Sequence, residues 1–477
     1  MTVPIHRWTA PLQLSRLVAV AIVALLIVAC GAGGDSRTAG IDRGGIGSGP
    51  VSGFGSIWLN GSRYETSGAD VFVNGQLATE SELRIGQVVL IRAIYGSGDP
   101  VGQTVVYESS LQGPVSAVDI AGNNITVLGQ QVLINAVTSF GSGIDPADIS
   151  GLKVDDIVEV SGLVDDQERI VATRIDLQGA PYEIQLNGVV SDLVSGVSFK
   201  VGDQLVDYSS ATTIDGFSGG APENGDRVRV TGDGFGSLSE IIAETVSFRG
   251  LPGVADGDEG EVEGLITDFI GPQNFRLAGI PVTATAQTVY EGGSSANLAD
   301  NVRIEAEGEF DNTGTLIADK IEFEDEGDSF LEAIVDPAGV SGDTVSVFGI
   351  TVLVTGQTAL EDKTDADERF FSIGDIIAGD TLRVEGSWNG SELVALKLER
   401  VNPEDKIKIK AAVSAAALPV FTMLGKQITT DAVLTDYQDD QPAFFSDLAL
   451  CVPGCEVEAR WLTADAPWTI VKEVELD

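Results

Sequence analysis

One pattern of short apolar stretches recurs along the chain after residue 48, at intervals of roughly 65 to 78 residues. Its clearest copy opens at residues 113–118 and continues through alternating apolar and polar residues at 124–132. Two further alternating stretches, 156–162 and 170–175, close it. Alternation with a period of two predicts strands that have one buried and one wet face. The chain is therefore expected to fold as a series of similar β-rich units.

Two landmarks identify the other copies of this unit. Its opening recurs as Gly49-Pro50-Val51, Gly188-Val189-Val190, Gly264-Leu265-Ile266, Ala333-Ile334-Val335 and Ala411-Ala412-Val413. A glycine expected in the turn between two strands recurs at Gly61, Gly129, Gly202, Gly279, Gly349 and Gly425. These landmarks predict units at residues 49–110, 111–180, 181–250, 259–325, 330–402 and 406–477.

Each unit is expected to contain three strands, a helix-like or irregular connection, and two more strands. Five antiparallel strands with an insertion between the third and the fourth is the strand order of an OB-fold barrel. An SH3-like barrel or an open sandwich has a similar strand count. The predicted fold is therefore all-β, a tandem array of about six small five-stranded antiparallel barrels, OB-like in the first interpretation.

The charge of the chain excludes one class of partner. The formal net charge is −44 and the isoelectric point is about 4.1, so the protein repels the phosphate backbone of nucleic acids. It also disfavours lying on an anionic membrane surface. Hydrophobic residues make up 43% of the chain and the mean hydropathy is +0.16, which is too apolar for a disordered polyanion.

The N-terminal segment has the features of a secretory signal. Arg7 and Arg16 precede an apolar run at residues 17–29, and Cys30 follows it. The run has about 13 residues, fewer than the roughly 20 that a membrane-spanning anchor needs. We expect residues 1–29 to be removed as a signal peptide, and residues 30–48 to form a glycine-rich tether.

Residues 26–30 (Leu-Ile-Val-Ala-Cys) resemble a bacterial lipobox, in which the cysteine is acylated before cleavage. That resemblance implies a lipid anchor on Cys30 and an extracytoplasmic location. Lipoproteins of Gram-negative bacteria that stay on the inner membrane often carry Asp after the cysteine, whereas this chain carries Gly31. The resemblance therefore implies an outer-membrane lipoprotein that faces the periplasm or the cell surface.

Residues within the second unit resemble the bacterial domain-of-unknown-function family 5666. The resemblance rests on Gly-Pro-Val near the start, Val-Leu-Gly-Gln-Gln-Val, Val-Glu-Val-Ser-Gly and Ile-Val-Ala-Thr-Arg-Ile. It is specific at residues 111–177, fair at 181–249 and 330–400, and weaker at 49–109, 259–324 and 406–476. It implies a small β-barrel unit in a secreted or lipid-anchored protein and carries no catalytic residues.

The only histidine is His6, inside the expected signal peptide. A mature chain without histidine excludes Ser-His-Asp and Cys-His catalysis and the common zinc and copper sites. Catalysis by a pair of carboxylates stays open, because Asp and Glu total 72. We expect no enzyme activity but a binding or spacer module of the cell envelope, with an envelope protein or glycan as partner. The alternatives are a carboxylate-based enzyme acting on envelope polysaccharide and a purely structural stalk.

Two acidic loops are weak candidates for calcium, the only cofactor considered, because hard cations need several oxygen ligands from a tight loop. Neither loop has EF-hand spacing, so a solvated turn is the alternative. The candidate ligands are Asp256, Asp258 and Glu261 in the first loop and Asp362, Asp365 and Asp367 in the second.

Three further features of the sequence suggest local roles. Cys451 and Cys455 flank a Pro-Gly turn and are expected to form a disulfide in an oxidising compartment. Trp388 precedes Asn-Gly and is either a weak candidate for ligand contact or a cap on the end of a unit. The run Lys-Ile-Lys-Ile-Lys at residues 406–410 places three cations on one face of a strand, as expected of a protected sheet edge.

Overall fold

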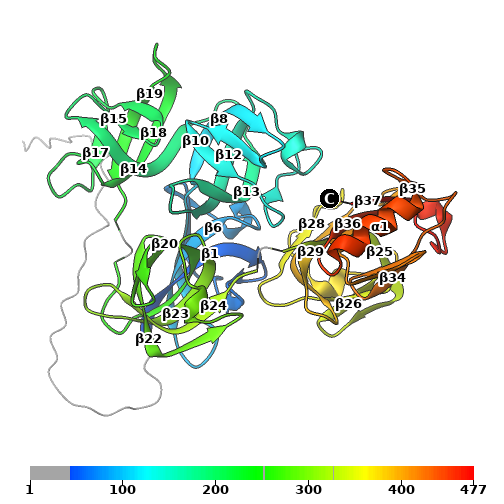
Figure 1. Cartoon of the computed structure of the whole chain (residues 1–477). Coiled ribbons are helices and arrows are strands. Elements are labelled where there is room, and N and C mark those ends of the chain that lie inside the picture. Colours follow the sequence, from blue (N-terminus) through cyan, green and yellow to red (C-terminus); the bar gives the residue numbers. More distant parts are fainter. Residues whose placement is uncertain (1–42, 251–252, 326, 477) are drawn as a thin grey trace, which may run out of the picture. The chain divides into compact units, whose positions relative to one another are not determined.

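The computed structural model describes residues 43–250, 253–325 and 327–476 (Figure 1). The expected signal peptide, Cys30 and residues 30–42 of the expected tether lie outside the described residues. Residues 43–48, also predicted as tether, instead form the first half of strand β1. Strands account for 54% of the chain and helices for 6%, so the all-β prediction is confirmed.

The strands fall into six sequence repeats, and the first three repeats contain no α-helix among their described residues. Repeat 1 comprises β1 (Arg43–Gly53), β2 (Ile57–Leu59), β3 (Ser62–Tyr64), β4 (Asp70–Val73), β5 (Gln76–Ala78), β6 (Val88–Tyr95) and β7 (Val101–Tyr107). Repeat 2 comprises β8 (Leu111–Asp119), β9 (Asn124–Val127), β10 (Gln130–Leu133), β11 (Ser139–Phe140), β12 (Ile157–Val164) and β13 (Ile170–Leu177). Repeat 3 comprises β14 (Ile184–Val194), β15 (Ser198–Val201), β16 (Gln204–Asp207), β17 (Thr213–Asp215), β18 (Arg227–Phe235) and β19 (Ile241–Phe248).

The last three repeats follow the same order. Repeat 4 comprises β20 (Glu259–Gly271), β21 (Asn274–Leu277), β22 (Ile280–Glu291), β23 (Arg303–Phe310) and β24 (Leu316–Phe323). Repeat 5 comprises β25 (Ser329–Ser341), β26 (Thr344–Val347), β27 (Ile350–Leu353), β28 (Ala359–Asp362), β29 (Thr381–Trp388) and β30 (Leu393–Val401). Repeat 6 comprises β31 (Lys406–Ala412), β32 (Ala415–Ala417), β33 (Val420–Met423), β34 (Lys426–Thr429), β35 (Asp436–Tyr437), α1 (Gln441–Cys451), β36 (Glu456–Leu462) and β37 (Glu473–Leu476).

Short helical turns occupy much of the connection that the sequence predicts as helix-like or irregular. Single 3₁₀ turns lie at Glu80–Glu82, Ile149–Gly151, Ser295–Asn297 and Ile373–Asp375, with one more at Thr463–Asp465 after β36. In repeat 6 the α-helix α1 takes this place in the chain. No helix among the described residues is both long and apolar enough to cross a membrane.

The predicted turn glycines are confirmed. All six have positive φ, between 53° at Gly202 and 82° at Gly279. In five of these hairpins the preceding residue also has positive φ; Leu128 before Gly129 is one example. Two successive left-handed residues make a type I′ turn, whose twist matches that of the flanking strands. Glycine is needed there because it adopts positive φ without a steric penalty.

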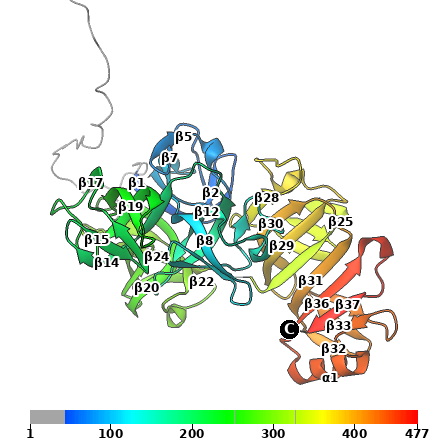
Figure 2. The ribbon, with the colours of Figure 1, turned by 90° about the horizontal axis from the view of Figure 1, so that it is seen from above.

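The sheets do not end where a repeat ends. In the described part of the chain one 12-stranded sheet contains strands of repeats 1 and 4, another contains strands of repeats 2 and 3, and a 10-stranded sheet contains strands of repeats 5 and 6. β32, β33 and β34 of repeat 6 form a separate 3-stranded sheet. The opening strand of each repeat makes the join. β1 pairs with β20 in parallel (Figure 1), whereas β8 pairs with β14 and β25 with β31 in antiparallel register. Figure 2 shows the yellow strands β29 and β25 continuing into the orange and red strands β31 and β36.

The hydrophobic cores follow the sheets. One continuous buried cluster runs from Leu331 in repeat 5 to Val474 in repeat 6, and a second runs from Leu111 in repeat 2 to Val246 in repeat 3. The core of repeat 4 includes Ile46 from β1 of repeat 1. Each repeat therefore buries apolar surface against another repeat as well as within itself.

The prediction of separate five-stranded barrels, whether OB-like or SH3-like, is wrong. The sheets form a β-solenoid of about 11 turns, and they continue from one repeat into another. The physical reason is that a unit of about 65 residues buries only about 60% of its unfolded surface, so joining cores adds stability. Pairing the opening strands also covers edges that would otherwise expose unpaired backbone groups.

Candidate functional site

The sheet of repeats 5 and 6 carries two rows of side chains that run across five strands, β30, β29, β25, β31 and β36. Residues in a row are direct cross-strand partners, and all lie on the face opposite the hydrophobic core. We call these ten residues the charge grid. The first row is Lys397, Glu385, Phe330, Lys410 and Glu458, and the second is Glu399, Arg383, Glu332, Lys408 and Arg460.

Opposite charges meet at most steps of the charge grid. The Arg383 guanidinium lies 2.9 Å from Glu332 and 3.6 Å from Glu399, its two row neighbours. Lys408 Nζ lies 2.9 Å from Glu458, and 5.1 Å from the centre of the Phe330 ring. Cross-strand pairs of opposite charge stabilise a sheet, and this alternation lets many ionic groups share one face.

The pKa values of two carboxylates of the charge grid are shifted in opposite directions. Burial raises the pKa of Glu385 to about 7, although Lys397 opposes the shift. Burial alone would also raise the pKa of Glu399, but the charges of Lys397, Lys363 and Arg383 lower it below its ordinary value. At neutral pH the two glutamates therefore differ in protonation.

A cleft of about 1150 Å³ lies over the charge grid. We call it the charged cleft. Besides grid residues its lining includes Lys406, Glu404 and Glu456, so basic and acidic side chains are both present. The facing wall comes from repeat 2 and is neutral or apolar apart from Asp148; it includes Ile120, Asn123, Ile134, Asn135, Phe140, Pro146 and Ile149. Clefts of this size that combine apolar surface with convergent polar groups are common ligand sites.

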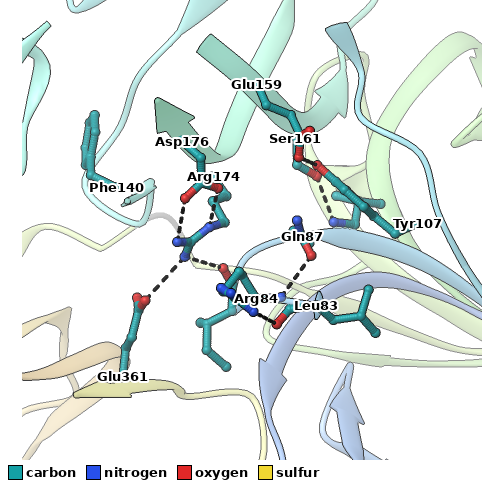
Figure 3. Close-up of polar contacts among 12 residues, drawn as sticks. Leu83, Arg84, Gln87, Tyr107, Phe140, Glu159, Ser161, Arg174, Asp176 and Glu361 are labelled. Atoms are coloured by element: carbon teal, nitrogen blue, oxygen red, sulfur yellow. Dashed lines mark hydrogen bonds and ion pairs between the residues drawn. The ribbon is translucent and has the colours of Figure 1, made fainter. Parts of the chain in front are cut away.

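The wall from repeat 2 is held by a buried arginine (Figure 3). Arg174 on β13 is only 4% exposed, and its Nε lies 2.6 Å from Asp176 Oδ2. Its Nη1 donates to the carbonyl oxygen of Ile85 in repeat 1 and lies 3.3 Å from Glu361 Oε1 in repeat 5. Burial alone would lower the pKa of Arg174, but Glu361 and Asp176 raise it. We call this contact among three repeats the Arg174 junction.

Further contacts tie the same three repeats together. Tyr107 of repeat 1 donates to Glu159 of repeat 2 at 2.8 Å, and the backbone N–H of Val88 donates to Ser161 Oγ at 2.8 Å. Burial raises the pKa of both Tyr107 and Glu159. Lys363 of repeat 5 donates from Nζ to the carbonyl oxygen of Phe140, which lines the charged cleft. The junction thus fixes one wall of the cleft relative to its floor.

The predicted local sites lie in different places. Cys451 and Cys455 are joined by a disulfide with a Cα–Cα distance of 5.5 Å. Trp388 ends β29, is half-buried and packs against the core shared by repeats 5 and 6. None of these three residues lines the charged cleft, so the structure does not bring them together with it.

The acidic candidates for calcium are also dispersed. Asp256 and Asp258 precede β20, whereas Glu261 lies within it. Asp362 is bound by Arg400 at 2.7 Å, and Asp365 accepts a hydrogen bond from Asn402. Burial alone would raise the pKa of Asp362, but its hydrogen bonds lower it. Within residues 43–250, 253–325 and 327–476, no three side chains of His, Cys, Asp or Glu are placed to hold a metal ion, Asp367 included.

The sequence interpretation of the Lys-Ile-Lys-Ile-Lys run is wrong in one respect. β31 is not a sheet edge, because it pairs with β25 on one side and β36 on the other. Its lysines face the charged cleft instead. A signal for the grid was present in the sequence, since Arg383-Val-Glu385 and Lys397-Leu-Glu399 alternate in the same way. Sequence reasoning missed it because the alternation does not reveal which strands are neighbours.

Comparison with known proteins identifies the repeats. A family described as a domain of unknown function (DUF5666) matches at residues 112–176, 187–237, 263–322 and 335–399, about half of the chain. These matches fall in repeats 2, 3, 4 and 5. A search of curated proteins finds no match. The chain therefore belongs to the domain-of-unknown-function family 5666, as four tandem copies of that domain.

Proposed function

We propose that this protein is a lipid-anchored, non-enzymatic binding protein of the cell envelope, and that the charged cleft is its binding surface. The observation that supports this proposal is the cleft of about 1150 Å³, with the charge grid as its floor. An extracytoplasmic location is supported only by the sequence of residues 1–31. The chemistry of the cleft favours a ligand that carries charged groups together with neutral surface, such as a charged glycan or an extended peptide.

The cations on β31 would provide the selectivity. Lys406, Lys408 and Lys410 lie on the same face of one strand, so their Cα atoms succeed one another at about 6.7 Å along the cleft. Lys408 and Lys410 are paired with Glu458 and Glu456. Lys406, which is exposed and lines the cleft, is a suitable residue for testing ligand contact without disturbing the core.

The binding proposal is tested with glycan and peptide arrays probed by the purified mature protein. Lys406→Glu should weaken any specific signal at least about tenfold, the effect of losing a contact worth about 1.4 kcal/mol. Lys200→Glu is the matched control, because Lys200 is a half-buried strand lysine of repeat 3 outside the cleft. Equal loss in both variants would indicate nonspecific electrostatics, and the absence of any signal would favour the alternative of a structural stalk.

The anchor is tested separately in cells. Acylation needs a cysteine thiol, so Cys30→Ser should move the protein from the membrane fraction to the soluble fraction. Membrane fractionation of the Ser variant that equals wild type would contradict lipid anchoring. The result is independent of the cleft, so either half of the proposal can fail alone.

A second candidate function is favoured by the opposite pKa shifts of Glu385 and Glu399, which both line the charged cleft. A pair of carboxyl groups, one with a raised pKa that keeps part of it protonated near pH 7 and one ionised, is the arrangement that hydrolyses glycosidic bonds. Incubation of the mature protein with envelope polysaccharide, followed by reducing-end analysis, tests it. Activity that is lost in Glu385→Gln and in Glu399→Gln but kept in Glu456→Gln would establish an enzyme and overturn the non-enzymatic proposal.

A further inference from the structure

The sheet that joins repeats 1 and 4 carries a ladder of glutamates on three adjacent strands. Glu263 on β20 lies directly opposite Glu305 on β23, which in turn lies opposite Glu322 on β24. One step along, Glu261 lies opposite Glu307. We call these five residues the glutamate ladder. Directly opposed like charges destabilise a sheet, so this arrangement needs a source of positive charge.

The cations near the glutamate ladder form ion pairs with Glu263, Glu307 and Glu322. Arg303 pairs with Glu263 at 2.5 Å, and Lys320 lies 2.7 Å from Glu307 and 2.9 Å from Glu322. Glu305 occupies the centre and is only 2% exposed. The groups that dominate its electrostatic surroundings are all carboxylates: Glu261, Glu263, Glu307 and Glu324.

The glutamate ladder continues into the joint between the two repeats. β1 of repeat 1 pairs in parallel with β20 at residues 45–48. Tyr64 of repeat 1 donates a hydrogen bond to Glu261 Oε2 at 2.9 Å. Glu261 is 6% exposed, and its other oxygen, Oε1, is buried without a hydrogen-bond partner among the described residues. β1 approaches this closely because Gly47 has no side chain; a Cβ there would lie 2.2 Å from the Tyr64 hydroxyl.

We propose that the joint between β1 and β20 is a proton-controlled latch, closed while Glu305 and Glu261 hold protons and weakened as they lose them. A proton on Glu305 removes the repulsion between this central group and the carboxylates around it. A proton on Glu261 removes the cost of burying a charge beside Tyr64. Glu261 lies on β20, the strand that contacts repeat 1, and Glu305 lies on β23, directly opposite Glu263 of β20.

The direction of the pH dependence follows from linkage. Burial, and then the neighbouring glutamates, raise the pKa of Glu305 to about 10; burial raises that of Glu324 to about 8 and that of Glu261 to about 7. An opened joint returns each group toward its ordinary value near 4.5. Between that value and the raised pKa, opening releases a proton, so each group makes opening about tenfold more favourable per pH unit as the pH rises.

The test is amide hydrogen exchange of the full mature protein between pH 5.5 and 9.5, corrected for the intrinsic rate of exchange. Peptides that cover β1 and β20 report on the latch. Their protection should fall at least about tenfold per pH unit up to pH 8. Glu305→Gln carries no titratable proton at this position. The protection of β1 and β20 in this variant should therefore fall by one factor of about ten less per pH unit than in wild type across this range. Glu261→Gln should reduce the slope only below pH 7.

Asp268→Asn is the matched control, because Asp268 lies on β20 but is exposed, outside the ladder, and paired with Arg276 within repeat 4. Its slope should equal that of wild type. Protection that is independent of pH in wild type, or an unchanged slope in Glu305→Gln, would overturn the latch. A slope that disappears in millimolar calcium would assign the neutralising charge to a metal ion and overturn the assignment to protons. If Glu305→Gln does not fold, Glu261→Gln alone decides between these outcomes.

Discussion

The sheet that joins repeats 1 and 4 and the sheet that joins repeats 5 and 6 use equivalent positions for charged residues, but with opposite electrostatic results. In repeat 5, Arg383 lies between Glu332 and Glu399. In repeat 4, Glu305 lies between Glu263 and Glu322. The equivalence is firm because both strands shift register at the next glycine, Gly386 or Gly308. The identity of one residue, Arg383 in repeat 5 and Glu305 in repeat 4, therefore decides whether the carboxylates beside it are neutralised or repelled.

In these two sheets the backbone pairing of the strands and the charge of the polar face are therefore set independently. The two sheets share strand order and a pairing of opening strands, so the fold does not depend on which charges lie on the polar face. The charges instead decide how each joint responds to pH. In repeat 5 an arginine neutralises the neighbouring carboxylates, whereas in repeat 4 we propose that bound protons do so.

The largest effect is expected from making the compensated sheet resemble the repulsive one. Arg383→Glu would place three carboxylates side by side and remove the ion pairs that Arg383 makes with Glu332 and Glu399. The free energy of unfolding should fall by about 5 kcal/mol, the upper range for breaking a buried ion pair. Urea denaturation at pH 7.5 measures it. Lys406→Glu, on the same face but exposed, should change stability by less than about 0.5 kcal/mol; equal losses would contradict the role of Arg383.

The sheet shared by repeats 2 and 3 extends the comparison to a third cation. Arg174 of repeat 2 occupies the position that Lys320 has in repeat 4 and Lys397 in repeat 5. Arg174→Met keeps the aliphatic volume but leaves Asp176 unpaired and the carbonyl of Ile85 without its donor. We expect a loss of about 3 kcal/mol in the free energy of unfolding. The control is Lys200→Met, which removes an exposed pair with Asp192 and should cost less than about 1 kcal/mol. A loss below that of the control would show that the junction is dispensable.

The converse exchange is expected to stabilise the protein. Glu305→Arg would reproduce in repeat 4 the arrangement of Arg383, with a cation between two glutamates. Stability at pH 8 should rise by about 1 to 2 kcal/mol, as for a partly buried pair of favourable geometry. Thermal unfolding at pH 6 and pH 8 should also show a smaller difference than in wild type. A destabilised variant would mean that the site cannot accommodate the larger side chain or that repulsion is not its dominant cost.

The smallest effect is expected from Glu385 of the charge grid, whose raised pKa contributes to the pH dependence of stability. Glu385 has a folded-state pKa of about 7, so its contribution to stability is lost as pH rises from about 4.5 to 7. Glu399, lowered in pKa, acts in the opposite direction and only below its ordinary value. Glu385→Gln should therefore remove about 1 kcal/mol of pH dependence between pH 6 and 7. An unchanged pH profile of thermal unfolding would contradict the shift.

The strands and turns of this protein can be predicted from its sequence because they depend on neighbours in the chain. Period-two alternation located the strands, and the positive φ of Gly129 and its equivalents follows from local hairpin geometry. The pairing of β1 with β20 cannot be predicted in this way, since more than 200 residues separate the partners. Edges that look alike in every repeat give no indication of which two will meet.

The charged cleft was beyond the sequence for the same reason. The alternation of Lys406, Lys408 and Lys410 was visible, but its interpretation as a sheet edge depended on what lies beside β31. The Arg174 junction combines residues from three repeats, so no local pattern marks it. The buried state of Glu305 was equally hidden, because an alternating Glu pattern usually indicates a solvent-facing strand side.

The central claim, that the sheets continue from one repeat into another, is tested most directly at β31 by residue-resolved amide exchange in the full chain. In a continuous antiparallel sheet, alternate residues of a strand bond to its two neighbours, here β25 and β36. A continuous sheet therefore predicts slow exchange at the consecutive amides of Lys408, Ile409 and Lys410. Fast exchange at every second amide would show that β31 is an edge strand, and that the repeats are separate units after all.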